Sequence, residues 1–168
     1  LNLCGLLPLY ELPKQVSLQL GAKPRQVSEH VWCLGEVPRI YPFEADRAVG
    51  ETLSACGCCW EADAVRDDTA LALTLPEGLF VVTGCAHAGV CNTVSHAKTV
   101  SGASRVLGLL GGFHLFETGA ALEQTLVTLR ALGVERVYPA HCTSLAVKAA
   151  FLGAFDTLEV GVGLTIDW

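Results

Sequence analysis

The chain has 168 residues, of which 51% are hydrophobic and 17% charged, and its formal net charge at pH 7 is −6. This length and composition predict a single globular domain with a substantial core. The 11 lysines and arginines form no cluster, which excludes the concentrated basic surface that nucleic acids and anionic membranes require.

The sequence shows no segment that marks export or membrane insertion. No apolar run approaches the roughly 18 residues that span a bilayer, and the first residues lack a basic region followed by an apolar block. We therefore expect a cytoplasmic protein with a small-molecule partner. The eight cysteines then predict reduced thiols or metal ligands rather than a disulfide framework. The run CGCC at 56–59 has no second paired-cysteine motif to complete a metal site, so we interpret it as a loop of free thiols.

The clear secondary-structure patterns begin at residue 68. Residues 1–67 are rich in proline, glycine and charge and give only short strand-like pieces, at 15–20 and 30–37. The stretches 70–75 and 79–82 have strand patterns, and the turn-forming residues Pro76, Glu77 and Gly78 lie between them. They predict a hairpin whose second strand ends at Gly84.

Strand and helix patterns alternate through the rest of the chain. Asn92 can cap a helix that runs to about Val100. Residues 119–133 predict an amphipathic helix, because four leucines share one face and Gly133 stands where a left-handed C-terminal residue is expected. These leucines are Leu122, Leu126, Leu129 and Leu132. We also expect strands at 105–112, 134–139 and 157–166, and a helix at 144–155 capped by Thr143 or Ser144.

A histidine follows each of three successive predicted strands. His87, His114 and His141 are spaced 27 residues apart, whereas His30 and His96 lack this placement and are expected on the surface or on a helix face. Strands joined by helices tend to run parallel and to share one C-terminal edge, so we expect the three imidazoles to converge there. Imidazole is a common ligand of zinc, iron and manganese, and a catalytic metal lowers the pKa of the water that it binds.

Other polar residues near these histidines have two interpretations each. Cys85 and Cys142 adjoin the histidine motifs and are either soft ligands or small core residues; the core role is favoured for Cys142, and the choice stays open for Cys85. The pair Asp67 and Asp68 caps the start of the hairpin or lies near a metal. Arg39 contacts an anionic group of a substrate or forms a surface ion pair.

Four motifs, in this order, resemble one branch of the metallo-β-lactamase-fold superfamily. They are GEVPR at 35–39, TGCAHAGVCN at 83–92, GGFHL at 111–115 and AHCTS at 140–144. The branch is described as dihydropteroate-synthase-like, or as related to 7,8-dihydropterin-6-methyl-4-(β-D-ribofuranosyl)aminobenzene-5′-phosphate synthase. The resemblance extends from about residue 24 to residue 163.

The resemblance implies an α+β fold, the four-layer αββα sandwich, with one or two metal ions at one edge of its sheets. The usual ion is zinc, with iron or manganese as alternatives. It implies that His87 and His141 are metal ligands and that His114 is a ligand or contacts the substrate. Cys85, assigned here as a further ligand, stands near the position where many members of the superfamily place a bridging aspartate. That difference puts a shared bridging carboxylate in doubt.

The superfamily's signature string His-x-His-x-Asp-His does not occur in this sequence. Because the chain also begins at Leu1 and contains no methionine, we expect residues 1–168 to form the C-terminal part of one domain of this fold. The sheet would then expose apolar surface for the absent N-terminal half, a second copy or another partner chain.

These observations favour a metal-dependent hydrolase that acts on phosphoesters or pterin-related compounds. His114 is the expected catalytic residue, and Arg39 the expected substrate-binding residue. The alternative is a non-catalytic ligand-binding or assembly domain, because the ligand-rich string is absent. A third hypothesis is nucleophilic catalysis by Cys85, activated by His87 or His114.

Overall fold

A computed structural model describes residue 13 and residues 17–45 and 48–167 of the chain. The helices are α1 (Pro42–Ala45), α2 (Val90–Ser101), α3 (Ala120–Ala131) and α4 (Leu145–Leu152). The first strands are β1 (Arg25–Ser28), β2 (Val31–Cys33), β3 (Glu51–Leu53) and β4 (Trp60–Ala62). The others are β5 (Ala70–Leu75), β6 (Gly78–Thr83), β7 (Val106–Gly112), β8 (Val134–Ala140) and β9 (Asp156–Thr157).

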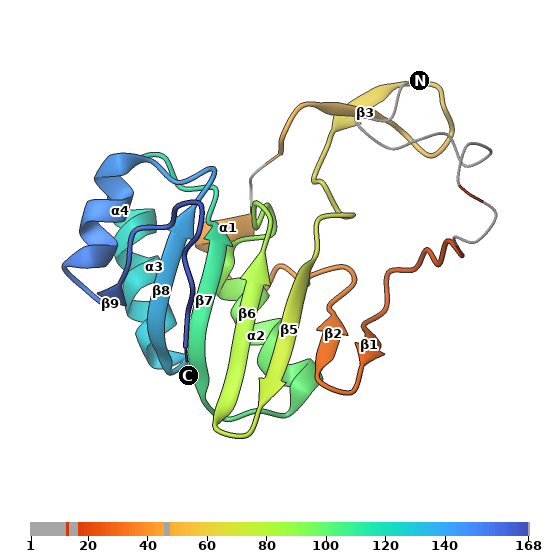
Figure 1. The fold of residues 1–168 in the computed structure, drawn as a ribbon. Coiled ribbons are helices and arrows are strands. Elements are labelled where there is room, and N and C mark those ends of the chain that lie inside the picture. The colour runs from red at the N-terminus through yellow and green to blue at the C-terminus, as the bar shows by residue number, and fades with distance from the viewer. Residues whose placement is uncertain (1–12, 14–16, 46–47, 168) are drawn as a thin grey trace.

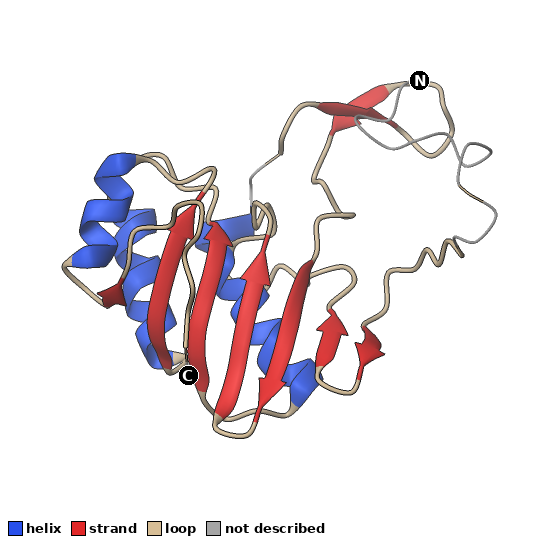
Figure 2. Cartoon of the chain, viewed as in Figure 1, coloured by secondary structure: helices blue, strands red, loops and turns tan. Residues whose placement is uncertain are grey.

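The main sheet has seven strands in the order β1-β2-β5-β6-β7-β8-β9. From β1 to β6 each strand pairs antiparallel with the next one in this order, whereas from β6 to β9 each strand pairs parallel with the next. The long helices α2 and α3 pack on the same side of this sheet (Figure 1, Figure 2). A helix returns the chain between each pair of parallel strands, so the C-terminal ends of β6, β7 and β8 share one edge.

The two faces of the sheet differ in what covers them. The face toward α2 and α3 carries Val81, Leu109 and Val137, which belong to the main core cluster and are completely buried. The register places a second apolar row on the opposite face, because side chains alternate along a strand. This row consists of Cys33, Leu71, Val82, Leu110 and Tyr138, one residue from each of five adjacent strands. Leu71 in this row is 40% exposed.

The β3–β4 hairpin forms a separate two-stranded sheet. Its register pairs Glu51 with Ala62 and Leu53 with Trp60. In Figure 1 the hairpin stands away from the seven-stranded sheet.

A buried carboxylate holds the start of α2. Glu44, which is 1% exposed, accepts hydrogen bonds from the backbone N–H groups of Cys91 (3.0 Å) and Asn92 (2.9 Å). Gly89 precedes the helix with φ 99°, and a Cβ at that position would collide with the Glu44 side chain. The negative charge thus lies against the N–H groups that a helix leaves unpaired at its N-terminus, where it is stabilising.

Several sequence predictions are confirmed here and two are wrong. The 70–83 hairpin, the three expected helices and the strands at 106–112 and 134–140 are present, and Ser144 caps α4 by accepting the N–H of Val147. Asn92 does not cap α2, because it lies inside the helix and its Oδ1 accepts the N–H groups of Ile40 and Tyr41. The closing strand at 157–166 is absent beyond Thr157, where a segment containing two glycines turns near Gly163.

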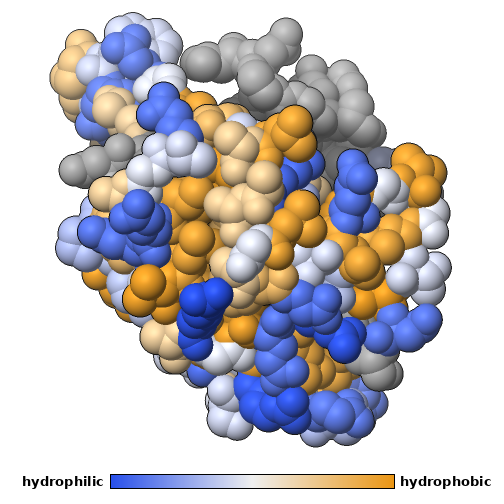
Figure 3. Space-filling model, turned by 90° about the vertical axis from the view of Figure 1, so that its left-hand side faces the viewer, coloured by the Kyte–Doolittle hydropathy of each residue, from blue (hydrophilic) through white to orange (hydrophobic). Residues whose placement is uncertain are grey.

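The face that carries α4 and β9 exposes apolar side chains (Figure 3). Leu145 is 82% exposed, Leu152 60% and Leu158 52%. Leu145, Leu152 and Leu158 border one small cavity of about 160 Å³. Among the described residues, no helix is long and apolar enough to cross a membrane.

Candidate functional site

The three histidines singled out by their spacing follow three adjacent parallel strands. His87 comes four residues after β6, His114 two residues after β7 and His141 directly after β8. A parallel bridge between Leu115 and Thr143 continues the pairing of the last two segments beyond the strands. The sheet topology therefore brings the three loops to one edge, as the spacing predicts.

Two of the imidazoles are in contact. The ring centroids of His87 and His114 lie 4.5 Å apart, at an interplanar angle of 55°. The His114 ring also packs edge-on against Phe116 at 5.0 Å. The rings of His87 and His114 thus lie side by side at this edge.

His141 lies in a group with the two neighbouring cysteines. The sulfur atoms of Cys85 and Cys142 and a ring nitrogen of His141 all lie within 4.8 Å of one another. The Cys142 thiol also donates to the carbonyl of Cys85 at 3.5 Å. Sequence reasoning favoured a core role for Cys142 and left Cys85 open, and the structure places both thiols beside His141. Among the described residues, His87 and His114 are outside this 4.8 Å group.

The loop backbones at this edge adopt an uncommon conformation. Ala86, His114 and His141 have φ angles of 54°, 47° and 42°. Residues other than glycine rarely take this left-handed conformation, which costs of order 1 kcal/mol each and occurs mainly where the surrounding structure imposes it. One such residue occurs in each of the three histidine loops, so the turns that orient the imidazoles are held by their surroundings.

Close backbone contact sets the spacing between the strands at this edge. A Cβ on Gly112, at the end of β7, would lie 2.5 Å from both the Cys142 sulfur and the Gly84 carbonyl oxygen. The N–H of Gly112 donates to that same carbonyl at 3.0 Å. Glycine is therefore required at position 112 to let the loops of Cys85 and Cys142 meet.

Asp68 and Arg39 hold the backbone of His87 on both sides. The His87 N–H donates to Oδ2 of Asp68 at 2.6 Å. Nη2 of Arg39 donates to the His87 carbonyl at 3.3 Å and also to the carbonyl of Ala64. Arg39 thus binds backbone oxygens of two loops rather than a surface carboxylate, and its role toward a substrate stays a prediction. The sequence predicted Asp68 as a cap at the start of the hairpin or as a residue near a metal, and did not predict its bond to His87.

The thiol of Cys85 is hard to ionise in this setting. Burial, the hydrogen bond to Cys142, and the electrostatic effects of Cys142 and Asp68 together raise the pKa of Cys85 from 9.0 to about 11. All of these causes disfavour the thiolate. They therefore weigh against Cys85 as an activated nucleophile in the metal-free protein, since an activated cysteine has a lowered pKa.

The donors at this edge fit a metal ion. Nδ1 of His87 is buried and, within the part of the chain that the structure describes, has no hydrogen-bond partner. A buried polar atom in that state costs free energy unless a ligand satisfies it. Imidazole and thiol groups are the donors that zinc and other first-row metals prefer, and the Cys85, His141 and Cys142 group supplies both kinds.

The other two histidines lie away from this edge, as expected. His30 is exposed on the turn between β1 and β2. The His96 ring lies on α2 and its Nε2 is 3.0 Å from the carbonyl oxygen of Leu34. Glu44 in α1 bonds the start of α2, and Asn92 in α2 bonds the segment just before α1. The sequence predicted Asn92 as a helix cap and did not predict these contacts. The sequence carries no periodic signal for such contacts between residues about 50 positions apart.

The fold matches that of a solved metal-dependent hydrolase. No known family model matches the chain. A metal-dependent hydrolase of the β-lactamase superfamily has a similar structure, with a TM-score of 0.76 over 90% of this chain and 58% of that one, at 24% sequence identity. The chain therefore has the metallo-β-lactamase fold, and the fold predicted from the motifs is confirmed. The described residues form one seven-stranded sheet with α2 and α3 on one side, which makes two layers of the predicted four.

Two curated relatives come from the archaeon Methanocaldococcus jannaschii. The chain is 33% identical over 94 residues to 7,8-dihydropterin-6-methyl-4-(β-D-ribofuranosyl)-aminobenzene-5′-phosphate synthase, covering 55% of this chain and 32% of the synthase. It is 26% identical over 132 residues to an uncharacterised protein, covering 79% of this chain and 47% of that protein. The first of these relatives supports the branch that the motifs resemble. The chain spans less than half the length of either.

Proposed function

We propose that this chain forms part of the active site of a metal-dependent hydrolase that acts on phosphoesters. The fold of the solved hydrolase supports the general class. The relative named as a dihydropterin phosphate synthase supports a phosphorylated, pterin-related compound as the finer substrate class. One fold hosts many chemistries. The proposal therefore rests on the residues at the C-terminal edge of β6, β7 and β8, called here the histidine edge.

The observation that carries this proposal is the buried, unsatisfied Nδ1 atom of His87. Its backbone is held from both sides by Asp68 and Arg39, yet its Nδ1 is buried without a hydrogen-bond partner among the described residues. A histidine that served only to support the loop would be expected to use that nitrogen in a hydrogen bond. An unsatisfied ring nitrogen on a fixed loop is available to a metal ion, which would satisfy it.

We assign roles to the residues of the edge on that basis. Cys85 and His141, whose donor atoms lie within 4.8 Å of each other and of the Cys142 sulfur, would hold the metal. His87, which is outside that group, would add a ligand from the neighbouring loop. Zinc is the first choice of metal, and iron or manganese are the alternatives. Such an ion, when bound, acts as a Lewis acid toward a phosphoryl oxygen. His114, whose ring stacks near that of His87, is the catalytic residue that contacts the substrate or donates a proton to the leaving oxygen. Phe116 packs on His114 and limits its orientation.

Metal content and turnover test the proposal together. The purified protein is analysed for metals and assayed with bis(p-nitrophenyl) phosphate, with and without prior treatment with a chelator. We expect bound metal near one equivalent or more, and turnover that chelation abolishes and metal restores. His87→Ala and His141→Ala should lose both metal and turnover, whereas His114→Ala should keep the metal and lose turnover. His30→Ala, at an exposed turn, is the matched control. Turnover that survives complete removal of metal would contradict the proposal.

A second candidate function is a non-catalytic ligand-binding or assembly domain. The absence of the His-x-His-x-Asp-His string from the sequence and the exposed leucines of α4 and of the segment after β9 favour it. In that case the protein would bind no stoichiometric metal, would not hydrolyse the phosphodiester, and would form a defined complex with a second copy or another chain. Metal content and turnover, with sedimentation of the same sample for the complex, separate the two candidates.

A further inference from the structure

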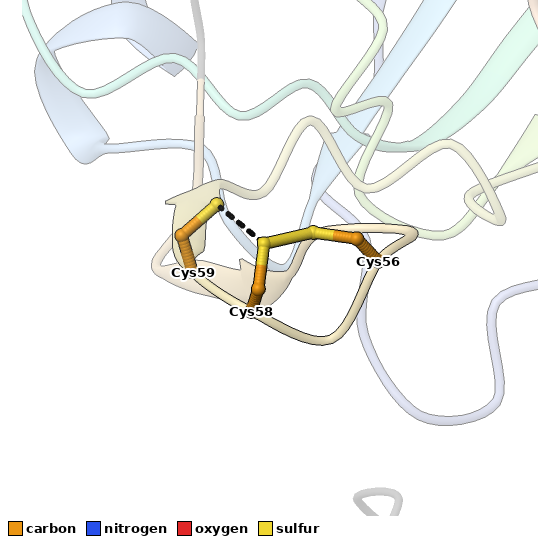
Figure 4. Close-up of side chains that lie close together, drawn as sticks. All are labelled: Cys56, Cys58 and Cys59. Atoms are coloured by element: carbon orange, nitrogen blue, oxygen red, sulfur yellow. Dashed lines mark hydrogen bonds between the residues drawn. A yellow bond between two sulfur atoms is a disulfide. The ribbon is translucent and has the colours of Figure 1, made fainter.

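A second group of sulfur atoms lies in the β3–β4 hairpin, away from the histidine edge. Cys56, Cys58 and Cys59 are all exposed, and their sulfur atoms lie within 4.8 Å of one another (Figure 4). Cys56 and Cys58 form a disulfide, and the Cys59 thiol is 4.0 Å from the Cys58 sulfur. The sequence prediction of a loop of free thiols is therefore wrong for two of the three, because the turn places residues 56 and 58 face to face.

The hairpin holds these sulfur atoms in place through bonds to Ser54. The N–H of Ser54 donates to the Cys59 carbonyl at 2.9 Å, and the N–H of Gly57 donates to the Ser54 carbonyl at 2.8 Å. The Ser54 hydroxyl oxygen accepts the Cys59 N–H and lies 3.2 Å from the sulfur atoms of both Cys56 and Cys59. Gly57 has φ 66°, which glycine adopts without strain. The turn thus places the sulfur atoms of Cys56 and Cys59 beside one hydroxyl, and the disulfide holds Cys58 next to Cys56.

The chemistry of the donors indicates which ligand would bind. The group consists of sulfur alone, with no histidine or carboxylate donor among the described residues within its 4.8 Å radius. Soft thiolates select Cu(I), zinc and iron–sulfur clusters. Zinc in a structural site takes four protein ligands in a tetrahedron, whereas the described residues supply three at this loop. Cu(I) is satisfied by three thiolates.

We propose that the reduced hairpin loop binds one Cu(I) ion through Cys56, Cys58 and Cys59. The Cys56–Cys58 disulfide is then the ion-free, oxidised form of the same site. Two molecules of a thiol reductant, R–SH, break the S–S bond by exchange and give two cysteine thiols and one R–S–S–R. Each of the three thiols releases its proton when it binds, and the copper stays Cu(I). The site is independent of the proposed hydrolase function.

Copper binding by the full chain tests this proposal. The protein is reduced with a phosphine, transferred to anaerobic buffer and titrated with Cu(I) against a chromophoric Cu(I) chelator. We expect the triple variant Cys56→Ser, Cys58→Ser, Cys59→Ser to bind one equivalent less than the unchanged chain. The lost equivalent should carry the near-ultraviolet sulfur-to-copper absorption. Each single variant should also lose this absorption. Cys33→Ser, which changes a cysteine outside both sulfur groups, should bind the same number of ions as the unchanged chain.

Two further measurements decide between this site and its rivals. Protein with the disulfide intact should lack the extra equivalent until reductant is added, and far-ultraviolet circular dichroism should show that the triple variant keeps its fold. Equal copper stoichiometry in the reduced chain and the triple variant would overturn the proposal. So would the displacement of the loop's Cu(I) by equimolar Zn(II). Loss of phosphodiester turnover in His87→Ala, by contrast, concerns only the histidine edge and leaves the copper result unchanged.

Discussion

The N–H of His87 donates a 2.6 Å hydrogen bond to the carboxylate of Asp68, which lies 19 residues earlier in the chain. Asp68 comes just before β5 and His87 just after β6, and the register pairs Ala70 of β5 with Thr83 of β6. The antiparallel hairpin therefore brings the two loops together. Asp68 ties the loop of His87 to the start of the sheet.

Removing the Asp68 carboxylate should loosen the His87 loop. A hydrogen bond to a charged group contributes about 1.5–3 kcal/mol, so we expect Asp68→Ala to lower the free energy of unfolding by about that amount and to reduce metal content. Asp68→Asn keeps an acceptor oxygen and should recover most of the metal content. Denaturant unfolding and elemental analysis measure the two effects. The exposed neighbour Asp67, changed to alanine, is the control, and an equal loss in both variants would show that position 68 has no special role.

Replacing Glu44 should destabilise the whole domain. Its carboxylate accepts the N–H groups of Cys91 and Asn92 and is 1% exposed. Glu44→Ala leaves buried donors without partners at the start of α2, which costs about 2–4 kcal/mol in the free energy of unfolding. Glu44→Gln keeps one acceptor and should cost less. Glu123→Gln, in the exposed first turn of α3, is the matched control and should change stability by less than about 0.5 kcal/mol. A Glu44→Ala chain as stable as the control would refute this role.

The sequence was sufficient to predict the parts of the fold that depend on local pattern. Alternation between Ala70 and Leu75 and the leucines of 119–133 are local signals, and they predicted β5 and α3 correctly. The histidine edge followed from the same patterns, since parallel strands place their C-terminal ends together. The contact between His87 and His114 agrees with that expectation.

The features that the sequence did not predict depend on contacts between distant residues. Asn92 has the composition of a helix cap, but a distant segment uses its side chain through the N–H groups of Ile40 and Tyr41. The run at 157–166 is rich in β-branched residues, yet only Asp156 and Thr157 pair with β8. A strand needs a neighbour to pair with, and sequence alone does not show whether an edge is available. The Cys56–Cys58 bond likewise depends on the turn geometry at Gly57.

Adding a methyl group at Gly112 should disturb the contact between the loops that carry Cys85 and Cys142. The new Cβ would lie 2.5 Å from the Cys142 sulfur and from the Gly84 carbonyl oxygen. The backbone oxygen cannot move freely, so we expect Gly112→Ala to lower the free energy of unfolding by about 1–3 kcal/mol, as overpacking does, and to reduce metal content. Gly84→Ala is the control, because nothing lies within 4 Å of a Cβ there. Equal behaviour of the two variants in unfolding and metal analysis would contradict the close contact.

In the metal-free protein, the rate at which Cys85 is alkylated should keep rising up to high pH. Burial, Cys142 and Asp68 raise its pKa from 9.0 to about 11. Because the thiolate is the reactive form, a rise of two units means about 100-fold less thiolate at pH 8. We expect alkylation of Cys85 by iodoacetamide, followed by peptide mapping, to keep accelerating between pH 9 and pH 11. In denaturant the profile should level off nearer pH 9.

Substitutions of the residues next to Cys85 test the direction of its pKa shift. Asp68→Asn removes a negative charge, and Cys142→Ser removes the neighbouring thiol that helps to raise the pKa, so both should move the profile of Cys85 to lower pH. Asp67→Asn is the matched control for loss of charge and should have a smaller effect, since Asp67 is not among the causes of the raised pKa. A native profile that levels off below pH 9 would mean that Cys85 is an activated thiol. In that case the hypothesis of cysteine nucleophilic catalysis would replace the metal hypothesis for this edge.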